Sequence, residues 1–420
     1  MPAIVFSAIA FGLLIFATPI FLAILAATFV SFELFAPPIP EMVLPQRMID
    51  GVNRFSLVAI PLFIFAADVI SRGQIGRRLV ELTEAMMGHI TGGVAIATAG
   101  ACAIFGAMSG VGPAAVVSIG PIVYPSLIRQ GYSKEFAVGL ILTASTLAML
   151  VPPGIAMILY AIETNNSVGA MFIAGLSTGV LFTAALAAYS YAYARIKGIG
   201  RMPKLSWAER GIALRRAGWA LGLPVIVLGG IYSGAATPTE AAAFACVYAI
   251  FVETAIYRQL HLRDMMQLST ASAQTIAVLM ILIAAGTVMT YFMTLMQYPA
   301  QISQAIGGVP PEGLLAMINI AFLVAGMFVD PNSAIIVLAP LVYQSAMAAG
   351  IDPIHLGAII VVNVAIGMVT PPFGLNLFIG MTTFRIGYVE AVKGVAPFLM
   401  LMIGVLLVVT YLPGIALFFL

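Results

Sequence analysis

The chain has 420 residues, of which 62% are hydrophobic and only 8% are charged, and its formal net charge is +2. A soluble domain carries roughly a quarter charged residues, so this composition excludes an ordinary soluble protein. The charges are dispersed over loops and form no basic surface, so no nucleic-acid partner is expected. Continuous apolar runs of about 17 to 30 residues, without alternation, predict an all-α polytopic membrane protein in a lipid bilayer and argue against a β-barrel.

The first apolar run, over residues 3–32, lacks a basic start and a convincing cleavage site, so we expect a retained helix. Its Thr18-Pro19 echoes Thr237-Pro238 further along the chain, and the run is either one bent helix or two short ones. The side of the membrane on which the N-terminus lies stays open. The later apolar runs are 55–71, 92–128, 135–165, 168–195, 217–233, 237–257, 266–297, 312–348, 353–383 and 394–420.

The charges of the loops predict how these segments are oriented. The run 92–128 has basic loops on both sides, whereas no Lys or Arg occurs between Arg263 and Arg385, which leaves both sides of the run 312–348 without positive charge. Basic loops of membrane proteins face the cytoplasm. The first of these runs therefore enters and leaves the membrane from the cytoplasm, and the second enters and leaves from the outside.

Both of these runs are too long for a single crossing, and each is interrupted in the middle. The interruptions are Ser109-Gly110-Val111-Gly112-Pro113 and Asp330-Pro331-Asn332-Ser333. Non-helical backbone at membrane depth is tolerated only where it is buried in protein or lines a wet cavity. The sequence therefore predicts two re-entrant helical hairpins with tips near the bilayer midplane.

A doubled proline interrupts the run that follows each hairpin. Pro152-Pro153 lies in the run 135–165, and Pro371-Pro372 lies 219 residues later, since 371 − 152 = 219. Two consecutive prolines unwind a helix, so both runs are expected to be broken helices. The same offset holds without a gap from Ala115 through Met149 to the proline pairs. Together with the opposite orientation of the hairpins, it predicts an inverted repeat, which is typical of transporters with a midplane site.

Four breaks thus belong to one predicted site. Half-helix N-termini offer unpaired N–H groups to an anionic substrate, and freed carbonyls with side-chain oxygens suit Na⁺. Ser109, Asn332, Ser333 and Thr370 lie at or beside a break, although hydroxyls in membrane helices also simply bond to the backbone. Because the second half lacks a basic residue near its breaks, we expect Na⁺ binding and anion binding to be coupled electrostatically.

Three carboxylates in apolar runs have more than one interpretation. Asp330 serves an ion site, caps the helix that follows it, or does both. Asp68 is interpreted as structural or snorkelling, and Glu240 as part of a helix start capped by Thr239 or Thr237. The three histidines are scattered, and no phosphate loop or hydrolase motif occurs, so an enzyme is not expected.

Several motifs together resemble the large membrane subunit of tripartite ATP-independent periplasmic (TRAP) transporters, and the similarity runs over essentially the whole chain. They are Phe105 to Gly110 (FGAMSG), Tyr124-Pro125 with Gly131-Tyr132, Pro152-Pro153, Thr237 to Ala242 (TPTEAA), Gly350 to Pro353 (GIDP) and Gly367 to Gly374 (GMVTPPFG). Each motif alone is weak, and their combination is specific.

The resemblance implies a sodium-coupled elevator-type secondary transporter in a prokaryotic, bacterial or archaeal, cytoplasmic membrane. It also implies a small membrane subunit as partner and a periplasmic binding protein that delivers an organic acid, with Na⁺ as coupling ion and no other cofactor. Scaffold helices are expected over 1–91 and 168–297, a transport domain over 92–165 and 312–383, and a C-terminal helix over 394–420.

Carried over to this sequence, the resemblance implies two overlapping sets of site residues. The expected substrate-binding residues are Ser109, Gly110, Gly112, Pro152, Pro153, Thr370, Pro371 and Pro372. The expected Na⁺ ligands are Ser109, Asp330, Asn332, Ser333, Asn363, Gly367 and Thr370. Val111 and Ala115 stand where many relatives carry small hydroxyl residues, which favours a backbone carbonyl as ligand at the first tip.

Three other functions share some of these features. A stand-alone sodium–dicarboxylate symporter would have hairpins and inverted repeats but would need no partner proteins. A channel would have re-entrant loops, but these polar-poor tips lack a repeated filter ring. A membrane enzyme would need a catalytic cluster. The cargo itself is not specified, because C4-dicarboxylates, 2-keto acids, sialic acids and other sugar acids all fit.

Overall fold

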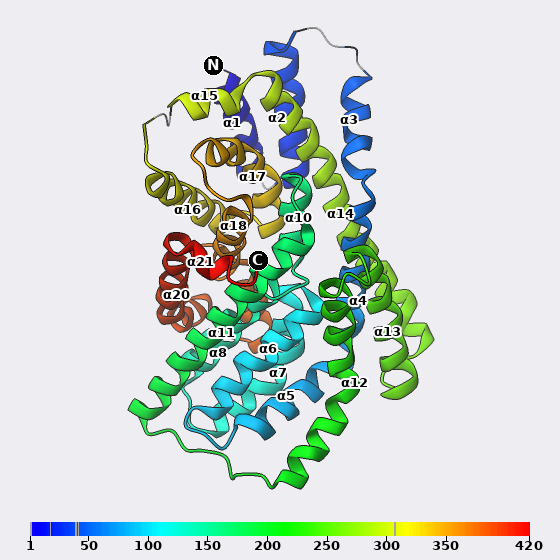
Figure 1. Ribbon diagram of the computed structural model, residues 1–420, viewed down its shortest axis with the longest axis vertical. Coiled ribbons are helices and arrows are strands. Elements are labelled where there is room, and N and C mark those ends of the chain that lie inside the picture. Colours follow the sequence, from blue (N-terminus) through cyan, green and yellow to red (C-terminus); the bar gives the residue numbers. More distant parts are fainter. Residues whose placement is uncertain (1, 17, 38–39, 41, 306–307) are drawn as a thin grey trace.

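The computed structural model describes residues 2–16, 18–37, 40, 42–305 and 308–420 (Figure 1). Throughout these residues the regular structure is helical, and no strand occurs among them. Seven helices of the described chain are long and apolar enough to span a membrane, and a bent pair over Lys134–Leu150 and Ile155–Glu163 raises the number to eight. The predicted all-α polytopic fold is confirmed.

The N-terminal half contains twelve of the elements that the structure describes. They are α1 (Pro2–Ile15), α2 (Ile20–Phe35), α3 (Val43–Val52), η1 (Phe55–Val58), α4 (Ala59–Arg72), α5 (Ile75–Met87), α6 (Gly93–Ser109), α7 (Gly112–Arg129), α8 (Lys134–Ser145), α9 (Leu147–Leu150), α10 (Ile155–Glu163) and α11 (Val168–Lys197). The run 3–32 is thus two helices, and α3 and α5 are short amphipathic helices that the apolar runs did not indicate.

The described C-terminal half is also built from helices. Its elements are α12 (Trp207–Tyr232), α13 (Pro238–Phe251), η2 (Val252–Ile256), α14 (Leu262–Leu295), α15 (Tyr298–Ala305), α16 (Pro311–Phe328), α17 (Pro331–Ala348), α18 (Pro353–Gly367), α19 (Leu375–Phe384), α20 (Tyr388–Tyr411) and α21 (Pro413–Ala416). The helix expected over 217–233 begins ten residues earlier (217 − 207 = 10), because its charged first turns are still helical.

Helix boundaries follow the internal repeat that the sequence shows, and they add α3 and α14 to it. α7 and α17 begin 219 residues apart (331 − 112 = 219) and also end 219 residues apart (348 − 129 = 219). The same offset separates the starts of α8 and α18 (353 − 134 = 219) and of α3 and α14 (262 − 43 = 219). Helix boundaries therefore preserve a duplication that the side chains outside the hairpins have mostly lost.

The two hairpins approach from opposite ends of the molecule. In Figure 1 the connection between α11 and α12, which carries Arg201 and Lys204, lies at the lower end, and α5, which precedes the first hairpin, lies toward that end. α15, which precedes the second hairpin, lies at the upper end. This arrangement agrees with the orientation inferred from the loop charges, although residues 306 and 307 of the second hairpin's entry lie outside the described chain.

Local sequence explains where several helices start. Thr237 accepts a hydrogen bond from the Glu240 backbone N–H (3.3 Å), and Glu240 accepts one in return from the Thr237 N–H (2.8 Å). This capping box satisfies two N–H groups of the first turn of α13 and confirms the interpretation of Glu240, with Thr237 and not Thr239 as the cap. Asp352 caps α18 in a similar way, through the N–H groups of Ile354 and His355.

Close helix crossings hold each hairpin against the broken helix of its own half. A Cβ added to Gly106 of α6 would lie 2.6 Å from the Cα of Ala148 in α9. In the second half, a Cβ added to Gly326 of α16 would lie 2.9 Å from the Cα of Gly367 in α18. Small residues allow such backbone contact in membrane proteins, where van der Waals packing drives helix association. The two crossings fix the positions of the hairpin tips.

Candidate functional site

The first hairpin tip rests on the first proline break. α6 ends at Ser109, and its C-cap Gly110 has a φ of +62°, in the left-handed region that suits glycine. A Cβ at this position would collide with the carbonyl oxygen of Pro153. The backbone N–H of Ile155, at the start of α10, donates to the Gly110 carbonyl at 3.5 Å. Tip and break are therefore in direct contact.

The same tip also reaches the second break. A Cβ added to Gly112 would lie 2.9 Å from Cε of Met368 and 3.4 Å from the carbonyl oxygen of Ser145. Met368 follows the last residue of α18, just before Pro371-Pro372. The peptide bonds Pro152–Pro153 and Pro371–Pro372 are both cis. The structure thus brings the first tip and both breaks together, as the sequence predicts.

The second tip is organised by Asp330. Its carboxylate accepts hydrogen bonds from the backbone N–H of Ser333 (3.0 Å to Oδ1) and from the Ser333 hydroxyl (2.5 Å to Oδ2). Pro331 occupies the first helical position of α17, where no N–H is needed. The capping interpretation of Asp330 is therefore confirmed. The Ser333 side chain is buried against its cap.

Amide side chains join the two broken helices and the second hairpin. The Asn376 amide of α19 donates to Oγ of Ser145 in α8 at 2.8 Å. The Asn363 amide of α18 donates to Oδ1 of Asn319 in α16 at 2.7 Å. The Thr370 hydroxyl, at the second break, donates to the Ile366 carbonyl at 2.7 Å. The Thr370 hydroxyl thus bonds to the backbone of its own helix, as hydroxyls in membrane helices often do. Its oxygen still keeps lone pairs for a ligand.

Around the breaks, five buried side-chain oxygens have no hydrogen-bond partner in the described chain. They are Oγ of Ser109, Oγ1 of Thr143, Oδ1 of Asn332, Oδ1 of Asn363 and Oδ1 of Asn376. A buried oxygen without a partner costs about 1–3 kcal/mol. Hydroxyl and amide oxygens of this kind are the ligands that a hard cation prefers.

A cavity of about 1030 Å³ lies beside the breaks. Both hairpin tips line it, through residues 110–114 and 330–333, together with Met149, Met368 and the first residues of α10 and α19. Its opposite wall consists of residues from α2, α4 and α14 with the Thr18-Pro19 segment before α2. Small-molecule sites typically occupy clefts of ~300–1,000 Å³, so this cavity can hold a small organic molecule.

The predicted site residues divide into two groups by their position. Gly110, Gly112, Asp330, Asn332 and Ser333 line the cavity. The others are set behind it or beside it, at the breaks and in the crossings described above: Ser109, Pro152, Pro153, Asn363, Gly367, Thr370, Pro371 and Pro372. Their roles as ligands of substrate or Na⁺ stay predictions.

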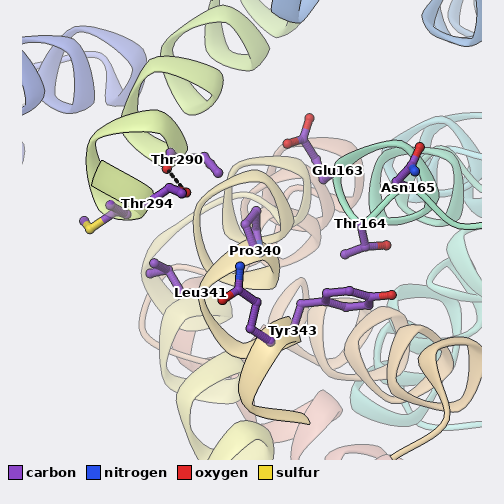
Figure 2. A pocket seen from close by; sticks show the side chains of 10 residues that line it. Glu163, Thr164, Asn165, Thr290, Thr294, Pro340, Leu341 and Tyr343 are labelled. Carbon is purple, nitrogen blue, oxygen red and sulfur yellow. Dashed lines mark hydrogen bonds between the residues drawn. The ribbon is translucent and has the colours of Figure 1, made fainter. Parts of the chain in front are cut away.

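A second, smaller pocket of about 180 Å³ lies away from the tips. Figure 2 shows Glu163, Thr164 and Asn165 at the end of α10, opposite Thr290 and Thr294 of α14. None of the predicted site residues lines this pocket.

Sequence reasoning missed some residues of the site. Asn376 and Thr143 are not among the predicted ligands, because only tertiary contact shows that their oxygens are buried without a partner. Asp68, interpreted as structural, lines the cavity with Arg72 of the same helix. Their i, i+4 spacing was the available signal, since it places both on one face of α4.

Comparison with known proteins identifies the family. The sequence model of the tripartite ATP-independent periplasmic transporter, DctM component, matches residues 7–415. An ectoine/5-hydroxyectoine TRAP transporter large permease protein of Ruegeria pomeroyi is 40% identical over 409 residues, which cover 97% of this chain and 96% of that protein. A C4-dicarboxylate TRAP transporter large permease protein of Pseudomonas aeruginosa is 40% identical over 373 residues, covering 88% of this chain and 87% of that protein.

A solved structure shares the fold. The crystal structure of the Alcanivorax borkumensis YdaH transporter matches with a TM-score of 0.64 and 13% identity, and covers 94% of this chain and 96% of that chain. At this identity the likeness concerns the arrangement of helices alone.

Proposed function

Because the chain belongs to the DctM family of TRAP transporters, we propose that it carries out sodium-coupled secondary active uptake of a small organic acid. It is a multi-pass membrane protein and a transport permease, not an enzyme. The named relatives transport ectoines and C4-dicarboxylates. Both kinds of cargo carry carboxylates, and both are small enough for the cavity. In this proposal the membrane is the bacterial cytoplasmic membrane.

The observation that carries the sodium part of the proposal is the group of five unpartnered oxygens at the breaks. Ser109 and Asn332 belong to the two tips, and Asn363 belongs to the helix that leads into the second break. A cation bound among such oxygens would offset the cost of burying them. Within the described chain no three or more His, Cys, Asp or Glu side chains form a group that could hold a metal ion. The oxygens that could bind a cation are therefore mainly neutral.

An elevator movement supplies the transport step in this proposal. The moving body comprises residues 92–165 and 312–383, with both hairpins and both broken helices. The scaffold comprises residues 1–91 and 168–297. The separation is supported by the cavity, which has the hairpin tips on one side and α2, α4 and α14 on the other. Secondary transporters commonly move one repeat-derived bundle against another around such a site.

Two partners complete the proposal: a small membrane subunit and a periplasmic binding protein that hands over the cargo. The alternative is a stand-alone sodium–dicarboxylate symporter, which would need neither. The two differ in a simple assay, because a symporter transports without the binding protein and copurifies with no small subunit.

The decisive experiment is uptake of a labelled organic acid into proteoliposomes under a sodium gradient. It is run with and without the cognate binding protein, and with choline in place of sodium. We expect uptake only when sodium and the binding protein are both present. An unchanged rate in choline would overturn sodium coupling, and an unchanged rate without the binding protein would favour the symporter.

A further inference from the structure

The cavity carries three formal charges among the residues that line it, and two of them lie on one helix. Asp68 and Arg72 belong to α4, and Asp330 belongs to the second tip. The carboxylate of Asp330 is engaged by Ser333. Most of the remaining lining is apolar, so Asp68 and Arg72 dominate the electrostatics of the wall opposite the tips. We call these two residues the α4 charge pair.

Arg72 is available for an anion. It is the last residue of α4 and is exposed, and in the described part of the chain it makes no hydrogen bond or ion pair. Its guanidinium has five N–H donors in a planar fork that matches a carboxylate. No other basic side chain lines the described part of the cavity. Arg72 is thus the single cationic contact for cargo there.

Asp68 is held in place by a hydrogen bond from a neighbouring helix. Its Oδ2 accepts a hydrogen bond from the Ser272 hydroxyl of α14 at 2.5 Å, and Ser272 is 1% exposed. Its Oδ1 has no hydrogen-bond partner among the described residues. Although Asp68 and Arg72 are one helical turn apart, no ion pair joins them there. The wall therefore places one carboxyl group and one guanidinium a single helical turn apart.

We propose that the α4 charge pair makes this transporter selective for a small zwitterionic carboxylate over a dianion, an inference that rests on the proposed function. The carboxylate of the cargo binds Arg72, and its cationic group faces Asp68. Arg72 is the one cationic side chain that the described lining offers to a dianion, and the second carboxylate of the dianion approaches Asp68, where like charges repel. We expect roughly tenfold weaker binding of the dianion.

The test measures equilibrium binding to the full chain, reconstituted with its small membrane subunit, in the same sodium buffer throughout. The zwitterionic probes are ectoine and glycine betaine, and the dianionic probes are succinate and malate. Wild-type protein is expected to bind a zwitterion about tenfold more tightly than either dianion. Arg72→Gln weakens binding of both classes about tenfold, and Arg72→Lys restores part of it. Asp68→Asn brings the two classes to nearly equal affinity, and Asp68→Glu restores the preference.

Arg77→Gln serves as the control, because Arg77 is exposed, pairs with Glu81 at 3.4 Å and does not line the cavity. It should leave both affinities unchanged. Thermal unfolding of every variant shows whether it is folded, and Asp68→Asn keeps an acceptor for Ser272. Tighter binding of dianions by the wild type, or an unchanged preference in folded Asp68→Asn, would overturn the inference. Failure of the proposed function is a separate result: zwitterion binding persists, but a sodium gradient drives no flux.

Discussion

Glu253 fastens the start of α5 to another part of the chain, and its removal should loosen that junction. Glu253 lies in η2, at the end of α13, and is 0% exposed. Its carboxylate accepts hydrogen bonds from the backbone N–H groups of Gln74 and Ile75, both at 2.9 Å. A Cβ at Gly73 would collide with this carboxylate. α5 is the connection between α4 and the first hairpin.

The size of the effect follows from these contacts. Glu253→Ala leaves two N–H groups at a helix start without acceptors, at about 1–3 kcal/mol for each buried group. The Ile75 N–H is buried and the Gln74 N–H is partly buried, so we expect a total loss of about 2–4 kcal/mol. Glu253→Gln keeps one acceptor but turns an NH₂ group toward the other N–H, so we expect an intermediate loss.

Two measurements check this prediction. Thermal unfolding in detergent reports the apparent stability, and hydrogen exchange reports protection of the Gln74 and Ile75 amides at the start of α5. Glu240→Gln is the matched control, because Glu240 also caps a helix start but is exposed, and its loss should cost less than ~1 kcal/mol. If Glu253→Ala unfolds at the same temperature as Glu240→Gln and α5 stays fully protected, the anchoring role is wrong.

Two further predictions concern the site and its packing. Ser333→Ala and Thr370→Ala should each raise the sodium concentration needed for half-maximal uptake. Thr382→Ala, at an exposed position of α19, should leave it unchanged. Wild-type sodium dependence in both site variants would contradict the predicted ligand roles. Gly326→Ala should lower the unfolding temperature, because its Cβ would lie 2.9 Å from the Gly367 Cα, and overpacking costs about 1–3 kcal/mol. Gly229→Ala in α12, where the Cβ meets open space, should cause no loss, and equal stability of the two variants would refute the close crossing.

Glycine and proline residues that interrupt helices made the hairpins and breaks predictable from the sequence. Gly110 and the two proline pairs act locally, since glycine ends α6 in the left-handed region and consecutive prolines interrupt a helix wherever they fall. The cap formed by Asp330 is local for the same reason, because donor and acceptor are three residues apart. Lys and Arg in the loops then supplied the orientation, which depends on charge rather than on packing.

The rest of the site depends on contacts between residues that are distant in the chain. Asn376 lies 231 residues from Ser145, and Glu253 lies 179 residues from Gln74, so no local pattern could pair them. The full extent of the repeat was hidden for another reason. Aligned at the 219-residue offset, the first ten residues of α3 and α14 read VLPQRMIDGV and LRDMMQLSTA, so the side chains have diverged while the helix starts kept the offset.

The duplication bears on the proposal that one site holds an anion together with a cation. The two halves contribute equivalent breaks but different side chains: the first tip has Gly110 and Gly112, which let backbone approach the breaks closely, and the second tip has Asp330. An exact two-fold site would place the same groups on both sides of the cargo. Divergence of the tips instead leaves a backbone-rich side and a carboxylate-bearing side, while Arg72 on the opposite wall supplies a positive charge that neither tip contains. The asymmetry of the cavity is therefore a property of side chains placed on a symmetric backbone.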